Sequence, residues 1–173
     1  EVYQKQDAWT WEHQALVRAR CVAGDTMLSK QITGVRAEIL AQKRDLTTLI
    51  KDVSEMRAKM REQLNKSTTE LFDLKQGEGG ITDIEFMVQY AALAWSSDCP
   101  GLLVYTDNIR MLEALKTSEK LSEHDSNMLA GAYRFYRKLA NHCILQEKPI
   151  VVPIERVAAY RTQVASIWQR WFG

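Results

Sequence analysis

Residues that could do chemistry concentrate in a glycine-rich segment near the middle of the chain. Gly77, Gly79 and Gly80 precede a run with helical periodicity, and Lys75 lies just upstream of them. The free N–H groups and the positive dipole end of a helix N-terminus attract anions, and a lysine adds a point charge, so this segment is a candidate phosphate site. It is neither a Walker A loop nor a GxGxxG loop. A tight turn that requires positive φ explains the same glycines, and the residues alone favour that structural reading.

Two carboxylates, Asp83 and Glu85, follow the glycines. Side chains two positions apart on a helix point about 200° apart, so these two cannot chelate one ion together. Thr82 and Glu85 match the capping-box pattern S/T-x-x-E, which predicts Thr82 as the N-cap. A purely structural Asp83 should then tolerate asparagine within about 1 kcal/mol.

A third group of polar and aromatic residues lies near the start of the chain. Trp11, Glu12, Arg18 and Arg20 occupy one predicted helix. One interpretation is an arginine-lined surface that meets phosphates or an acidic partner. The other is a set of intrahelical salt bridges, with the tryptophans as core anchors.

Several other classes of site and protein are not indicated. The three cysteines are far apart and odd in number, and no zinc-ligand spacing, HExxH motif or Gly-Ser…Asp-x-Asp motif occurs, so we expect neither metal ligands nor catalytic residues in this chain. The formal net charge of +1 argues against a nucleic-acid binder. No apolar run of about 18 residues indicates a membrane span, and no signal peptide is indicated, so we expect a cytoplasmic protein with reduced thiols.

The elements that must position these residues are almost all helical. Apolar periodicity predicts helical segments at about 7–21, 25–41, 46–64, 82–95, 108–115, 122–143 and 154–172, with one short run at 71–75 that alternates like a strand. The clearest stripe is Leu46, Leu49, Val53, Met56, Met60 and Leu64. We therefore predict a single all-α domain over residues 1–173, a bundle of about six helices with the Gly-rich loop before a central buried helix. Because the chain opens on Glu1 rather than Met, we expect a piece of a longer protein.

The sequence also resembles a known family. Residues 9–20, Trp-Thr-Trp-Glu-His-Gln-Ala-Leu-Val-Arg-Ala-Arg, are similar to the WExQALxRAR signature of glutamine synthetase adenylyltransferases. Residues 72–86, Phe-Asp-Leu-Lys-Gln-Gly-Glu-Gly-Gly-Ile-Thr-Asp-Ile-Glu-Phe, resemble their DLKxGxGGIxDIEF signature. Residues 107–110 and 132–137 are similar to further landmarks, and residues 168–171 resemble the C-terminal end. The resemblance therefore spans essentially the whole chain.

The family implies a cytoplasmic enzyme with two halves. One half adenylylates a tyrosine of glutamine synthetase with ATP and Mg²⁺, the other removes the AMP, and glutamine and a PII-type signal protein set the balance. This chain resembles the helical domain that follows the adenylylating nucleotidyltransferase core. The core's metal ligands are absent from it, so we expect the chain alone to be inactive. The resemblance implies that both signatures line the core's active-site cleft, with Lys75, Gly77, Gly79, Gly80, Asp83, Glu85, Trp11, Glu12, Arg18 and Arg20 as the cleft-facing candidates.

Two alternatives remain open from the sequence. The chain could be a non-catalytic regulatory module that binds the PII-type protein or glutamine synthetase, with its critical residues on the exposed long helices. The related domain of a PII uridylyltransferase is less favoured, because the two complete signatures fit the adenylyltransferase better.

Overall fold

The computed structural model describes residues 2–3 and 7–173. This part contains seven α-helices, two short strands and two 3₁₀ turns, which confirms the all-α class. The seven helices correspond to the seven predicted helical segments, whereas the bundle as a whole was expected to have about six. In chain order the elements are α2 (Thr10–Val17), α3 (Thr26–Leu40), α4 (Leu46–Leu64), β1 (Leu71–Asp73), α5 (Ile81–Trp95), η1 (Pro100–Leu103), α6 (Asn108–Thr117), α7 (Glu123–Leu145), β2 (Val151–Pro153), η2 (Ile154–Arg156) and α8 (Ala158–Phe172).

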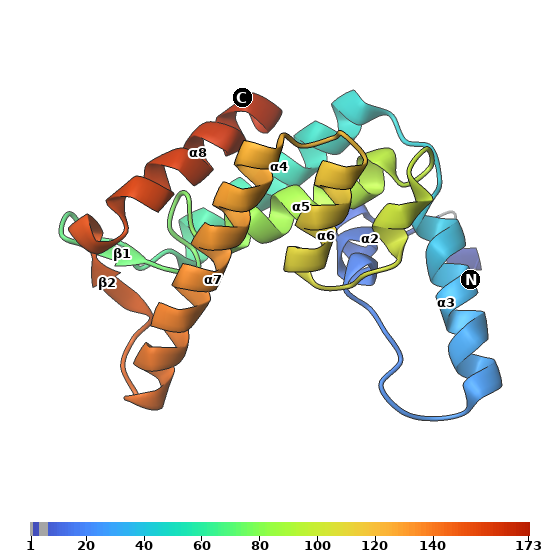
Figure 1. Ribbon diagram of the computed structural model, residues 1–173, viewed down its shortest axis with the longest axis horizontal. Helices are drawn as coiled ribbons and strands as arrows, with labels where there is room; N and C mark the ends of the chain where they lie inside the picture. Colours follow the sequence, from blue (N-terminus) through green and yellow to red (C-terminus); the bar gives the residue numbers. More distant parts are fainter. Residues whose placement is uncertain (1, 4–6) are drawn as a thin grey trace.

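The middle of the bundle is formed by α5, around which the other helices are arranged (Figure 1). It contacts α2, α4, α6, α7 and α8. Most of its side chains are buried, from Ile81 to Leu93. At its C-terminal end, Tyr90 and Trp95 pack edge-on against Phe172 and Trp171 of α8. The prediction of a central buried helix after the Gly-rich loop is confirmed.

A two-stranded antiparallel sheet joins the Gly-rich region to the last part of the chain. In β1, Leu71, Phe72 and Asp73 pair with Pro153, Val152 and Val151 of β2. The extended run at 71–75 was expected, whereas β2 and the 3₁₀ turn η2 replace the predicted start of the last helix at residue 154. The pairing brings the start of α8 next to the Gly-rich loop (Figure 1).

Most of α4 has the predicted amphipathic character, with one important difference. Leu49 and Val53 are buried as expected, but the third buried residue of the helix is Arg57. Leu46 and Leu64, at the ends of the predicted apolar stripe, are exposed. The buried row therefore follows the i, i+4 spacing 49–53–57 and carries a charge into the core.

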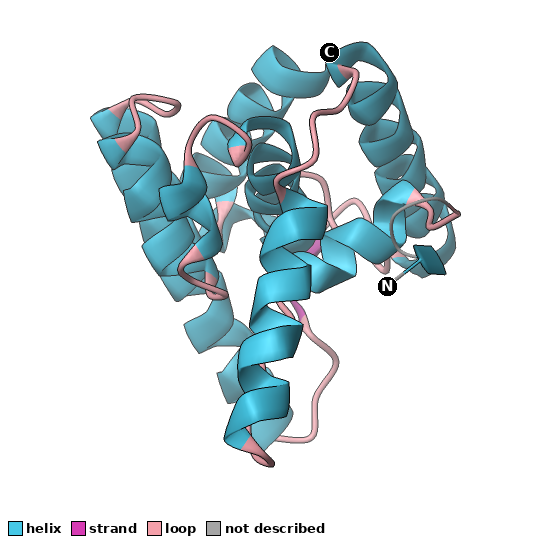
Figure 2. Cartoon of the chain, turned by 90° about the vertical axis from the view of Figure 1, so that its right-hand side faces the viewer, coloured by secondary structure: helices cyan, strands magenta, loops and turns pink. Residues whose placement is uncertain are grey.

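Helix α3 extends away from the body of the domain (Figures 1 and 2). Only Arg36, Ile39 and Leu40, near its C-terminal end, are buried. The Arg36 guanidinium donates to the main-chain oxygens of Leu16, Val17 and Leu103, which fixes this end of the helix to α2 and η1. Its outer half leaves Met27, Leu28 and Ile32 exposed.

Candidate functional site

The Gly-rich loop is closed by hydrogen bonds within the chain. Of the eight backbone N–H groups from residue 75 to residue 82, all except that of Glu78 donate to a described residue. The buried Asp73 carboxylate accepts from the N–H groups of Lys66, Lys75 and Gln76. Because these donors already have acceptors, they do not form an open cradle for a phosphate.

Close packing explains all three glycines, since a Cβ on Gly80 would lie 2.8 Å from the Gly77 carbonyl oxygen. Gly79 has φ +81°, and a Cβ on it would lie 2.4 Å from the Arg161 carbonyl oxygen of α8. A Cβ on Gly77 would lie 2.4 Å from the Phe72 ring. The loop therefore needs glycine both for its backbone conformation and for contact with α8 and β1.

The first turn of α5 differs from the predicted capping box. Gly80, not Thr82, is the N-cap, and the Thr82 hydroxyl is buried without a partner in the described part of the chain. Asp83 occupies position N3, where its Oδ2 accepts from the Gly79 N–H at 2.7 Å. The capping prediction was wrong because the helix begins two residues earlier, which places Asp83 rather than Glu85 at the reciprocal position.

Asp83 is the centre of a buried ion-pair network between α4 and α5. Its side chain is 1% exposed and contacts the fully buried Arg57 at 2.6 Å and Arg61 at 3.0 Å. The Arg57 guanidinium also donates to the side-chain and main-chain oxygens of Gln76. Burial lowers the pKa of Arg57, and the Asp83 carboxylate opposes that shift. This network fixes the Gly-rich loop to α4.

Glu85 joins four elements at a partly exposed position. Its Oε1 accepts from Arg18 of α2's C-cap at 2.8 Å, from Tyr133 of α7 at 3.1 Å and from Asn108 of α6 at 3.4 Å. Oε2 accepts no hydrogen bond from a described residue. Burial and then the Glu85 carboxylate raise the pKa of Tyr133, so its hydroxyl keeps the proton that it donates. The predicted divergence of Asp83 and Glu85 is confirmed.

The residues of α2 do not follow the predicted core role. Trp9 and Trp11 are 69% and 49% exposed, so neither is a core anchor in the described structure. Glu12 accepts from the Trp9 backbone N–H and the Tyr3 hydroxyl, and Arg20 is exposed with no partner among the described residues. The buried polar contact of this helix is made by Gln14, which donates to Gln89 of α5. An exposed surface replaces the expected intrahelical salt bridges.

The candidate residues therefore make two contacts with one another, and the other candidates lie elsewhere in the structure. The structure brings Arg18 to Glu85, and Gly79 to Asp83. Lys75 is exposed elsewhere, beside Lys66 in a shallow pocket of about 270 Å³ that Ile150 and Val151 also line. Trp11 lies in another pocket, of about 410 Å³, between α2 and α4.

Sequence reasoning missed the partners of both carboxylates: Arg57, Arg61, Asn108 and Tyr133. One signal was present for the first pair, since Arg57 and Arg61 continue the i, i+4 row of Leu49 and Val53. An arginine in a buried row needs an acceptor, and the carboxylates after the glycines were among the candidates. Asn108 and Tyr133 lie in the landmarks at residues 107–110 and 132–137, but nothing in those runs pointed to Glu85 as their partner.

The described residues show neither a metal-binding group nor a membrane span. No three His, Cys, Asp or Glu side chains in this part gather in a way that could hold a metal ion. Within the same residues, no helix combines the length and apolar character that crossing a bilayer requires. Cys21, Cys99 and Cys143 are free thiols.

Two family models match the chain. The model described as GlnD PII-uridylyltransferase matches residues 53–148, which include the Gly-rich loop and α5 to α7. The model described as Glutamate-ammonia ligase adenylyltransferase matches residues 1–35, which include α2.

Individual relatives share one name, bifunctional glutamine synthetase adenylyltransferase/adenylyl-removing enzyme. The protein of Pseudomonas syringae pv. tomato is 49% identical over 178 residues, which is 96% of this chain and 18% of the relative. That of Nitrosococcus oceani is 51% identical over 166 residues, or 96% of this chain and 17% of the relative. That of Pseudomonas aeruginosa is 48% identical over 179 residues. The chain therefore spans less than a fifth of the length of these relatives.

Proposed function

Since the chain belongs to the domain family of the PII-uridylyltransferase model, in the form found in bifunctional glutamine synthetase adenylyltransferases, we propose that it is the helical part of such an enzyme. The parent enzyme transfers AMP from ATP, with Mg²⁺, to a tyrosine of glutamine synthetase in the cytoplasm, and so controls nitrogen assimilation. Glutamine and a PII-type signal protein regulate it. This domain follows the adenylylating core, forms one wall of its cleft and relays regulation, while the catalytic metal ligands lie in the core.

The observation that carries the proposal is the contact between the two signatures. Arg18 and Glu85 are 67 positions apart in the sequence, and their side chains meet at 2.8 Å. They are 41% and 20% exposed, so the pair borders solvent rather than the core. Asn108 and Tyr133 fix Glu85 from two further helices, which leaves Oε2 for an external donor. A pre-arranged polar group at the surface suits a cleft wall.

The contribution of the Gly-rich loop to phosphate binding is proposed to come from side chains. Its backbone donors from residue 75 to residue 82, except the Glu78 N–H, are used within the chain, and the Asp83 carboxylate accepts from the Gly79 N–H just before the helix. The exposed ammonium groups of Lys75 and Lys66 lie at the same pocket and remain available to an anion. The loop's glycines then act by holding Lys75 at the right place.

Lys75→Ala in the full-length parent enzyme tests this assignment. We expect adenylylation of glutamine synthetase to fall about 10²–10³-fold, as for loss of one charged contact to a transition state, with an unchanged melting temperature because Lys75 is exposed. The deadenylylating activity should change much less. Lys30→Ala, an exposed lysine on α3, is the matched control. Wild-type adenylylation by Lys75→Ala would leave the loop with a structural role only.

The isolated chain provides a second test. Incubated with ATP, Mg²⁺ and glutamine synthetase, it should incorporate no AMP above a control without protein. Measurable incorporation would contradict the assignment of the metal ligands to the core.

A regulatory module is the second candidate, because α3 exposes an apolar face. Leu28 and Ile32 are 58% and 54% exposed and lie on a helical stripe, spaced 4, 3 and 4, that leads through Val35 to the buried Ile39. Such a face suits a protein partner, here the PII-type protein or glutamine synthetase. Leu28→Asp with Ile32→Asp should abolish a response to the PII-type protein and spare basal adenylylation if regulation is the main role. Loss of basal activity would favour the cleft-wall assignment.

A further inference from the structure

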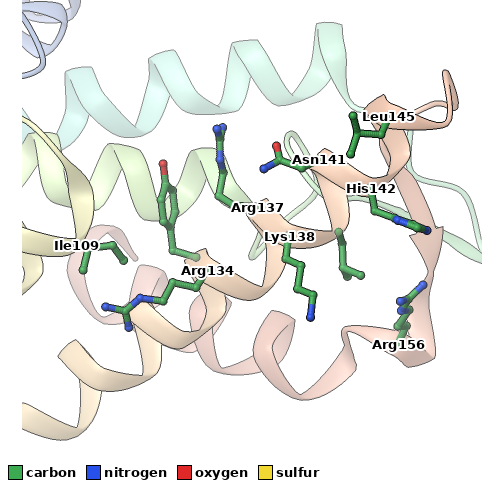
Figure 3. A pocket seen from close by; sticks show the side chains of 10 residues that line it. Ile109, Arg134, Arg137, Lys138, Asn141, His142, Leu145 and Arg156 are labelled. Carbon is green, nitrogen blue, oxygen red and sulfur yellow. The ribbon is translucent and has the colours of Figure 1, made fainter.

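A basic pocket on α7 is not explained by the proposed function. It has a volume of about 780 Å³ and is bordered by α7, by Ile109 of α6 and by Arg156 at the end of η2 (Figure 3). Arg134 and Arg137 belong to the family landmark at residues 132–137, in which the cleft proposal gives a role to Tyr133 alone.

The cations of this pocket have no counter-charge within the described structure. Arg134, Arg137, Lys138 and Arg156 are exposed, and none makes a hydrogen bond or ion pair with a described residue. Elsewhere in the described structure every arginine except Arg20 is engaged: Arg18, Arg57, Arg61, Arg110 and Arg170 contact carboxylates, and Arg36, Arg44 and Arg161 contact main-chain oxygens. With a net charge of only +1, the surplus in this pocket is local.

The positive charges lie on two sides of the pocket. Residues 134, 138 and 142 follow the i, i+4 spacing, so they form a row about 12 Å long on α7. In Figure 3 the Arg134 and Lys138 side chains leave α7 on the same side, and Arg156 approaches that side from the segment after β2. The β1–β2 pairing fixes the chain only three residues before Arg156. An anion between these elements would meet cations from both.

The remaining lining combines three aliphatic residues with Tyr133, Asn141 and His142. Ile109, Leu139 and Leu145 contribute aliphatic surface, and Leu139 is buried. A volume of this size lies in the range of small-molecule sites, about 300–1,000 Å³, and the planar fork of arginine matches phosphate oxygens. We propose that this pocket binds a small organic phosphate, with its phosphates on Arg134, Lys138 and Arg156 and its apolar portion against Ile109 and Leu139.

This site is independent of the cleft proposal but physically connected to it. Tyr133, which borders the pocket, donates its hydroxyl hydrogen to Glu85, the residue that pairs with Arg18. A ligand that displaces Tyr133 would alter the Glu85 cluster.

Titration calorimetry on the 173-residue chain tests the proposal with three probes: inorganic phosphate, tripolyphosphate and adenosine triphosphate. We expect one saturable site, with affinity that increases in that order as charge and then apolar surface are added. Arg134→Ala and Arg156→Ala, on opposite sides of the pocket, should each weaken binding of adenosine triphosphate about tenfold. Lys30→Ala is the matched control and should bind as the wild type does, whereas Lys75→Ala separates this pocket from the Gly-rich loop. All four positions are exposed, so the melting temperatures should agree.

Four results would overturn the proposal. The first is the absence of saturable binding of any probe at millimolar concentration. The second is equal weakening by Lys30→Ala, which indicates non-specific attraction. The third is binding of a polyglutamate peptide alone, which indicates a surface for an acidic protein. The fourth is loss of binding in Lys75→Ala but not in Arg134→Ala. That result places the phosphate at the Gly-rich loop, and so supports the cleft proposal while excluding this pocket.

Discussion

The two carboxylates near the N-terminus of α5 are in different environments. Asp83 is buried against two arginines of α4 and the Gly79 N–H, whereas Glu85 lies at the surface and meets Arg18, Asn108 and Tyr133. Both residues belong to the same signature and differ by two positions. Because residues two positions apart on a helix are rotated by about 200°, the two side chains point in nearly opposite directions. One signature can therefore contain residues that hold the loop in place and residues that meet a partner, and substitutions should separate them.

The largest effect on stability is expected at Asp83. Asp83→Ala leaves Arg57 with its charge buried and unpaired, and removal of one partner of a buried ion pair typically costs about 3–5 kcal/mol. Asp83→Asn also removes the charge, so the sequence-based expectation that asparagine costs no more than about 1 kcal/mol does not agree with this geometry. Urea unfolding monitored by circular dichroism measures both variants.

The control for this prediction is the paired replacement. Arg57→Met with Asp83→Leu removes both charges at similar volume and should be less destabilising than Asp83→Ala alone. Equal stability of Asp83→Ala and the wild type would show that the network does not hold the loop, and the contrast with Glu85 would disappear.

An intermediate effect on stability is expected at Gly79, whose N–H donates to the buried Asp83. Gly79→Ala places a Cβ at positive φ and 2.4 Å from the Arg161 carbonyl oxygen, for which we expect a loss of about 2–4 kcal/mol. Gly34→Ala is the matched control, since a Cβ there meets nothing within 4 Å and helix propensity favours alanine by up to about 1 kcal/mol. Thermal melts of the two variants should shift in opposite directions; a shared direction would contradict the close approach of α8.

The smallest effect on stability is expected at Glu85. Glu85→Gln keeps an acceptor for Arg18 and Tyr133 in a partly exposed cluster, so the free energy of unfolding should change by no more than about 1 kcal/mol. In the parent enzyme, adenylylation should nevertheless fall if Glu85 faces the cleft. Melting temperature and adenylylation activity should be measured for the same variant. If Glu85→Gln were unstable but active, Glu85 would have a structural role like that of Asp83.

The sequence predicted those elements whose signals are local. The spacing of Leu49 and Val53 predicted α4 with its bounds, and the apolar run of residues 84–95 predicted the burial of α5. Local signals did not predict where a helix begins relative to its glycine, so Thr82 was wrongly assigned as the cap. They also did not predict exposure of Trp9 and Trp11, because apolar type alone does not show which face of a short helix is covered.

The site was less predictable because its contacts are non-local. The candidates Arg18 and Glu85 were identified separately, and their contact depends on the packing of α2 against α5. The pairing of Asp83 with Arg57 likewise depends on how α4 lies over the loop. Sequence therefore indicated candidate residues, but not what each of them touches.

The small sheet has a consequence for how the chain folds. Its three residue pairs are about 80 positions apart in the sequence, so β1 and β2 close a long chain loop that contains α5, α6 and α7. Closing a loop of that length has a considerable entropic cost, so the strands pair more slowly than helices that are neighbours in the sequence. We expect α5 to α7 to associate before the strands pair. The packing of α8 against Gly79 should form last in the folding reaction.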